Sequence, residues 1–131
     1  MMIEGPITVM LVTDQIRCEN IISMGAKVAK KAKTNPVVLT ALVSNHETYN
    51  FQAIEHLFAK AKKHSAQLNT IYTDDVVASI AEYINSHNTK QVITGVPKDE
   101  NSSVYKLADL CPKAEFLVCL DGARQPVLLN N

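Results

Sequence analysis

Short β-branched runs alternate with longer amphipathic stretches along almost the whole of this 131-residue chain. The short runs suit buried strands, and the longer stretches carry apolar residues three and four positions apart, as one face of a helix does. Strands that alternate with helices form a parallel sheet, because each helix returns the chain to begin the next strand in the same direction. The pattern therefore predicts an α/β fold, with a doubly wound parallel sheet and helices on both faces.

Five strands and four helices are expected. The strands are residues 7–13, 36–44, 67–73, 91–95 and 115–120. The second run is nearly continuous in apolar residues, which predicts a central strand covered on both faces, and the third is less apolar, which suits a sheet edge. The helices lie between the strands, and their inward faces are expected to carry Cys18, Ile22, Gly25, Ala29 and Ala32; Phe51, Ile54, Leu57, Phe58 and Ala61; Val77, Ile80, Ala81 and Ile84; and Val104, Leu107, Ala108 and Cys111.

Length places these elements in one domain, residues 1–131, with a core at 7–121. The tail at 122–131 is apolar enough to dock on another surface, and a dimer interface is one candidate. The 13 basic and 13 acidic residues cancel, which removes the long-range field that a nucleic-acid or anionic-membrane binder uses. No apolar run reaches the ~20 residues of a membrane span, and no secretory signal pattern opens the sequence. We expect a cytoplasmic protein whose three cysteines are buried, reduced thiols.

Several catalytic motifs are absent. The four glycines cannot form a dinucleotide-binding G-x-G-x-x-G, a P-loop or a nucleophile elbow. His46 and Glu47 begin a zinc-protease pattern, but Asn50 occupies the place of the second histidine, so no metal site is expected. The sequence predicts a protein that is not an enzyme, with slow ATP hydrolysis as the remaining catalytic possibility.

Charged residues near the helix ends have two interpretations. Asp74 and Asp75 precede a helix, where carboxylates cap backbone N–H groups. Lysines gather in the last turns of the first two helices, where cations offset the helix dipole, and an anion-binding patch is the alternative. The lysines are Lys30, Lys31, Lys33, Lys60, Lys62 and Lys63. The four histidines are expected to be surface residues rather than general bases.

A binding site is expected where the strands end, since doubly wound sheets bind ligands beyond the carboxyl ends of their strands. Asp14 and Ser44 stand at such ends; Asp14 either accepts hydrogen bonds from a nucleoside or caps the next helix. Gly95 either lets a ligand approach the backbone or only forms a turn. Ser102 and Ser103 either direct hydroxyls and helix amides at a phosphate or only cap a helix.

Three segments resemble the universal stress protein family: GAKVAKK at 25–31, DDVVASIAEY at 74–83 and QVITG at 91–95. The resemblance covers residues 7–121 and is greatest to the universal stress protein domain of the Kdp potassium-sensor histidine kinase. It implies an adenine nucleotide alpha hydrolase-like fold, with five parallel strands in the order 3-2-1-4-5.

The same resemblance implies an adenine-nucleotide site, for ATP or another adenine nucleotide with magnesium. The family's phosphate loop has a second glycine where Lys98 stands here, and a closing glycine where Ser102 stands. The residues that correspond to the site are Thr13, Asp14, Val43, Gly95, Lys98, Ser102, Ser103 and Val104.

The leading hypothesis is a non-catalytic signalling or stress-response module in which a nucleotide orders the loop at 96–101. The alternative is a ligand-free scaffold that forms a homodimer or contacts a regulatory protein. The dimer would form through strand five, taken as a sheet edge, with Phe116, Val118, Leu120 and the tail at 127–129. Neither nucleic acid nor a membrane is expected as a partner.

Overall fold

A computed structural model describes residues 5–12, 18–43, 51–97, 99, 101–120 and 122–129, with the backbone alone for residues 18, 43 and 51–53. Strands and helices alternate along these segments, as predicted. The elements are β1 (Ile7–Leu11), α1 (Cys18–Ala32), β2 (Asn35–Val43), α2 (Phe51–Lys63), β3 (Gln67–Thr73), α3 (Val76–Ser86), β4 (Thr89–Thr94), α4 (Ser103–Leu110), β5 (Glu115–Val118) and β6 (Val127–Leu128).

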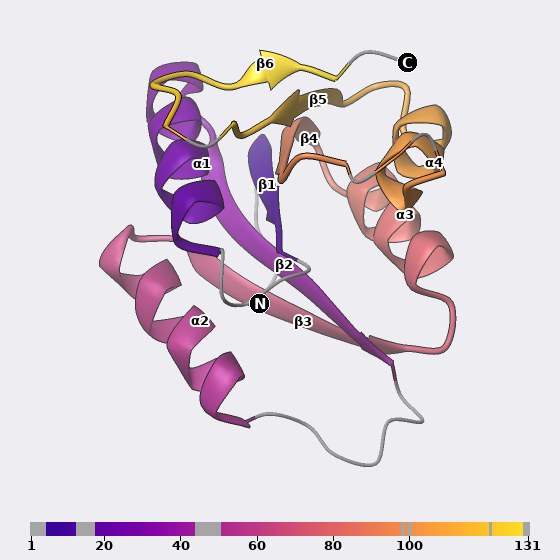
Figure 1. The fold of residues 1–131 in the computed structure, drawn as a ribbon, viewed down its shortest axis with the longest axis horizontal. Helices are drawn as coiled ribbons and strands as arrows, with labels where there is room; N and C mark the ends of the chain where they lie inside the picture. Colours follow the sequence, from indigo (N-terminus) through magenta and orange to yellow (C-terminus); the bar gives the residue numbers. More distant parts are fainter. Residues whose placement is uncertain are drawn as a thin grey trace.

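The sheet has the order β3-β2-β1-β4-β5-β6, and the first five of these strands are parallel. The predicted α/β class and the order 3-2-1-4-5 are confirmed. Helices α1 and α2 cover one face of the sheet, and α3 and α4 cover the other (Figure 1). The long crossover helices account for this arrangement, since each must pass over a face of the sheet to reach the next parallel strand.

The core has two halves, one on each face, and alternate residues of the central strands supply both. Val9 of β1 packs in the half beneath α3 and α4, and its neighbour Met10 packs in the half beneath α1 and α2. In β2, Leu39 and Val38 divide in the same way. This division follows from the two-residue period of a strand, and it confirms β2 as a strand covered on both faces.

The two ends of the sheet differ from each other. Strand β3 is an edge, as predicted. The expectation that strand five is also an edge is wrong, because β6 pairs antiparallel with β5 and the Leu129 amide donates to the Phe116 carbonyl at 3.0 Å. The apolar tail thus satisfies the outer backbone groups of β5. Phe116 and Val118, expected at a dimer surface, are buried in the core.

The charged residues at the helix ends lie where the sequence predicts them, and some strands begin or end at other residues than predicted. The Asp75 carboxylate caps α3 by accepting from the Ala78 amide at 3.1 Å. Five of the six predicted lysines occupy the last turns of α1 and α2, and Lys33 comes directly after α1. Strand β1 ends two residues before the predicted Thr13, β4 begins two residues before Gln91, and β5 ends two residues before Leu120. Among the described residues, no helix is long and apolar enough to cross a membrane.

The buried faces of α1 and α2 were predicted with two errors. Ile22 and Ala29 of α1 are buried, but Ala32 is exposed, while α2 buries Leu57 and Ala61 and leaves Phe58 58% exposed. Among the described residues, helix α2 contacts β3 and α1 most closely, so its buried stripe is narrow. Phe58 is displaced by about 100° from Leu57 around the helix, which takes it out of that stripe.

The structure describes the side chains of two of the three cysteines, Cys111 and Cys119, and both are buried as predicted. The Cys111 thiol lies 3.9 Å from the Ala81 carbonyl oxygen, and burial raises the pKa of this thiol. Burial disfavours the thiolate because a charge is poorly solvated in an apolar environment. Of the histidines, His56 is exposed and His64 and His87 are partly exposed, while His46 lies outside the described residues.

Candidate functional site

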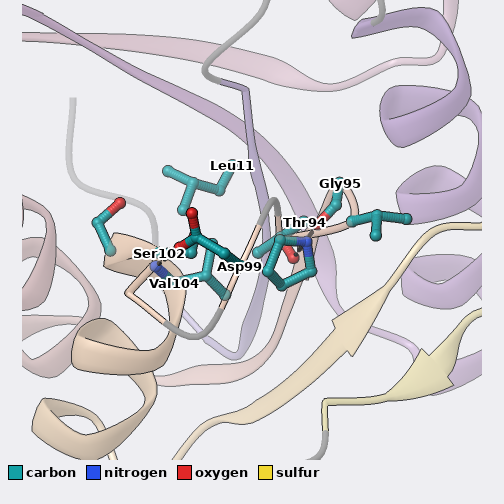
Figure 2. A pocket seen from close by; sticks show the side chains of 9 residues that line it. Leu11, Thr94, Gly95, Asp99, Ser102 and Val104 are labelled. Carbon is teal, nitrogen blue, oxygen red and sulfur yellow. Dashed lines mark hydrogen bonds between the residues drawn. The ribbon is translucent and has the colours of Figure 1, made fainter.

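A groove of about 360 Å³ opens at the carboxyl ends of β1 and β4, beside the first turn of α4 (Figure 2). This is the end of the sheet at which a doubly wound fold binds its ligands. Strand β1 contributes one apolar wall, the segment after β4 forms the opposite side, and α4 closes the end. The lining residues are Leu11, Thr94, Gly95, Val96, Pro97, Asp99, Ser102, Ser103 and Val104.

The wall after β4 is held by backbone pairing. The carbonyl of Thr94 accepts a hydrogen bond of 2.8 Å from the Cys119 amide, and the buried Thr94 hydroxyl donates to the Gly95 carbonyl at 2.9 Å. A Cβ atom on Gly95 would lie 3.6 Å from the Cδ1 atom of Ile21, which is an ordinary contact. Gly95 also has no left-handed backbone angle, so neither the turn nor the packing demands glycine there.

The first turn of α4 directs polar groups toward the groove. Ser102 is the N-cap of α4, and its hydroxyl accepts from the Val104 amide at 3.4 Å. Ser103, the first residue of the helix, is exposed and lines the groove. The Val104 and Tyr105 amides of this turn donate to Ser102, and the positive end of the helix dipole lies at the same turn. This turn can therefore receive an anionic group.

The carboxylate of Asp99 lies beside the positive end of α4 (Figure 2). The Asp99 carboxylate accepts a hydrogen bond of 2.9 Å from the Asn101 amide. The backbone carbonyl of Asp99 accepts a second one, of 3.1 Å, from the Ser102 amide. Figure 2 shows the Asp99 carboxylate beside Ser102 and Val104. Its negative charge offsets part of the attraction that α4 offers a phosphate, and a carboxylate placed next to phosphate oxygens is a typical partner for Mg²⁺.

The structure brings together four of the eight predicted site residues: Gly95, Ser102, Ser103 and Val104. Val43 ends β2 with its backbone opposite Thr73 of β3 and is not among the lining residues of the groove. Thr13, Asp14 and Lys98, together with the candidate Ser44, lie outside the described residues.

Five lining residues were not predicted: Leu11, Thr94, Val96, Pro97 and Asp99. Four of them could have been predicted from the sequence, because they lie on or next to the strand ends already assigned to the site. Asp99 could have been predicted from a different feature of the sequence. An aspartate three residues before a helix N-cap can form a turn with its carboxylate, and that places its charge at the end of the helix.

The sequence matches no protein-family model and no curated protein. Its structure, however, is similar to solved structures of universal stress proteins. A universal stress protein from Archaeoglobus fulgidus superposes with a TM-score of 0.68 at 16% identity, covering 90% of this chain and 95% of that one. The chain has the fold of the universal stress proteins. The order of its five parallel strands is thus explained by a known architecture.

Two further structures support the same fold. UspA from Lactobacillus plantarum gives a TM-score of 0.59 at 12% identity, covering 88% of this chain and 97% of that one. The universal stress protein from Archaeoglobus fulgidus in complex with dAMP gives 0.58 at 18% identity, covering 97% and 98%. In each comparison nearly the whole of the other chain is covered, so the likeness extends over most of the fold.

Proposed function

We propose that this chain is a non-catalytic universal stress-type module that binds an adenine nucleotide at the carboxyl ends of its strands. The observation that carries the proposal is the groove between Leu11, Gly95 and the first turn of α4, at the ligand-binding end of a doubly wound sheet. A protein with the same fold was solved in complex with dAMP, which supports this class of ligand. The closer resemblance to the Kdp sensor domain stays a prediction.

The lining residues divide the proposed site into two parts. Leu11, Val96 and Val104 give apolar contact for a nucleoside, and Ser103 with the first turn of α4 offers donors to a phosphate. Thr13 and Asp14 follow β1 in the sequence, and we assign Asp14 to the nucleoside. The signalling step is a change in the loop at 96–101 when the nucleotide binds, which alters the surface offered to a partner.

The proposed site favours a monophosphate over a free triphosphate. Asp99 places a negative charge beside the first turn of α4, and Lys98 and Ser102 stand where family members have glycines that free backbone amides for phosphates. Magnesium would offset the charge of Asp99 by bridging its carboxylate and phosphate oxygens. We assign no catalytic step, since the one carboxylate among the described lining residues is already engaged in a turn.

Calorimetric titration tests this proposal. We expect AMP and dAMP to bind with one site per chain, and ATP to bind several-fold more tightly with magnesium than without it. Asp14→Ala should weaken the binding of each nucleotide. Absence of heat and of any shift in melting temperature with millimolar AMP, dAMP and magnesium-ATP would overturn the proposal, because a ligand at a hundred times its Kd adds about 2.7 kcal/mol to the native state.

The matched variant is Asp99→Asn, which keeps a side-chain oxygen to accept from the Asn101 amide and removes the charge. Without magnesium, ATP should bind to this variant roughly fivefold more tightly than to the parent, since two unit charges about 4 Å apart in water interact by about 1 kcal/mol. With magnesium the order should reverse. An unchanged affinity in both conditions would place the phosphates away from Asp99.

A dimeric scaffold is the second candidate function, and the sheet edge favours it. Val127 and Leu128 of β6 are 45% and 57% exposed, and Leu120 is exposed nearby in sequence. Edge strands with apolar side chains invite pairing with another chain. We expect a dimer in sedimentation analysis that Leu128→Lys dissociates. A parent protein that remains monomeric at high concentration would remove this candidate.

A further inference from the structure

A second groove, of about 510 Å³, lies at the opposite end of the sheet from the first and shares no lining residue with it. The last turns of α1 form one wall, and the connection between β5 and β6 forms the other. Gln91 of β4 and its pairing partner Glu115, the first residue of β5, line the groove between these walls. In Figure 1 the connection between β5 and β6 passes beside α1.

The walls carry an excess of positive charge. Lys27 and Lys31 are one helical turn apart on α1, and Arg124 comes from the connection to β6. Among the described residues that line the groove, Glu115 is the one acidic residue. Within the described ranges, the only ion pair joins Lys60 to Glu19, so Glu115 does not pair with any of the three cations. The described residues of the lining therefore have a net charge of +2.

The helix dipole does not account for all of these cations. Lys31 lies in the last turn of α1, where a cation offsets the negative end of the dipole. Lys27 lies a turn earlier, and Arg124 is not in a helix. Their presence around one groove therefore needs a reason other than helix stability.

Gln91 adds an oriented donor to the groove. The buried Thr8 hydroxyl donates to the Gln91 side-chain oxygen at 2.7 Å and is itself hydrogen-bonded to the Thr34 hydroxyl at 2.5 Å. Thr8 has one hydroxyl hydrogen, so when it donates to Gln91, Thr34 donates to Thr8. The amide nitrogen of Gln91 has no acceptor among the residues that the structure describes, and its two hydrogens are available to a ligand.

The floor of the groove is apolar. Met24 of α1 and Leu117 of β5 line it and are almost completely buried, with Val28 and Pro126 at its sides. An ion alone would gain nothing from these residues, because apolar surface contributes through the burial of other apolar surface. The groove thus suits a molecule with an anionic end and an apolar body.

We propose that this groove is a binding site for a phosphate-bearing small molecule with an apolar or aromatic body. A phosphate monoester carries about −1.5 to −2 charges at pH 7, which matches the net charge of the lining. Lys27, Lys31 and Arg124 receive the phosphate, and the Gln91 amide donates to one of its oxygens. The apolar body covers Met24 and Leu117. This site does not depend on the nucleotide function proposed for the other end of the sheet.

The test is a titration of ¹⁵N-labelled protein followed by NMR, with 1-naphthyl phosphate as the probe and 1-naphthol and inorganic phosphate as its two halves. We expect saturable shifts at the amides of Val28, Leu117 and Arg124, with the whole probe binding at least about tenfold more tightly than either half, because charged hydrogen bonds and apolar burial both contribute. Shifts confined to the groove at the carboxyl ends, or no saturable shifts, would overturn the proposal.

Two double variants with equal charge changes decide whether the lysines act as a site. Lys27→Gln/Lys31→Gln should weaken the binding of the probe at least about tenfold, since it removes two cationic donors to the phosphate. Lys62→Gln/Lys63→Gln removes the same charge from exposed positions on α2 and should change the affinity less than twofold. Equal losses in the two variants would mean non-specific attraction and would refute the site.

Gln91→Glu tests the oriented amide. The variant keeps an oxygen to accept from Thr8 and replaces the donor nitrogen with a second oxygen, so we expect at least about a tenfold loss of probe affinity with 1-naphthol affinity unchanged. Equal loss for 1-naphthol would show a disturbed groove rather than a lost phosphate contact, and an unchanged affinity for the probe would remove Gln91 from the site.

Discussion

Leu57→Ala is expected to lower the free energy of unfolding by about 2–5 kcal/mol, the usual cost of a leucine truncation in a packed core. Leu57 is 0% exposed and packs in the half of the core beneath α1 and α2. The truncation removes apolar burial and leaves a cavity that the sheet cannot fill by relaxing. Since domains of this kind are stable by only about 5–15 kcal/mol, the melting temperature should fall by many degrees.

Phe58→Ala is the matched control, one residue further along the same helix. Phenylalanine is the larger side chain, and the apolar pattern of α2 predicts both residues inward, but Phe58 is 58% exposed. We expect its truncation to cost less than about 1 kcal/mol, as is typical of surface substitutions. Urea unfolding followed by circular dichroism measures both variants. A larger loss for Phe58 than for Leu57 would mean that α2 is rotated on the sheet, or that Phe58 is buried in an assembly.

The spacing of the apolar residues and the residue types at the helix and strand ends were sufficient to predict most of the fold. The bounds of β3 were predicted to the residue, and Asp75 caps α3 as its position before an apolar stretch indicates. The tail was harder to predict. Two residues of β6 are too few for a periodic pattern, and their pairing with Leu117 and Val118 depends on which strand the sheet leaves uncovered. An edge is a property of the assembled sheet, so sequence alone could not show that β5 is covered.

The position of the candidate site in the fold could be predicted from the sequence, but the chemical roles of several of its residues could not. Topology places ligands at the carboxyl ends, and Gly95 and Ser103 do line a groove there. The role of Asp99 depends on the turn that aims its carboxylate at α4, and the second groove depends on Lys27 and Arg124, far apart in the sequence, meeting across β5. Residues that are far apart in the sequence and share no local motif give no pattern from which their contact in the fold could be predicted.

Gly25→Ala should destabilise the protein although alanine is the better helix former. Gly25 is buried inside α1, and a Cβ atom there would overlap the Cγ and Sδ atoms of Met10, itself fully buried on β1. Overpacking of a core typically costs about 1–3 kcal/mol, whereas alanine regains about 1 kcal/mol of helix propensity over glycine. We expect a net loss of up to about 2 kcal/mol in urea unfolding, because the backbone of α1 must move away from β1.

Gly95→Ala is the control for that loss, since the Cβ atom it adds meets only the Cδ1 atom of Ile21 at 3.6 Å. Its stability should be unchanged, or should rise by up to about 1 kcal/mol through a less flexible unfolded chain. A double-mutant cycle then assigns the cause. Met10→Ala removes the side-chain atoms that the Cβ atom added at Gly25 would overlap, so the double variant Gly25→Ala/Met10→Ala should lose less stability than the two single losses added together. Additive losses would mean that Gly25 is needed for a reason other than the close approach of α1 to β1.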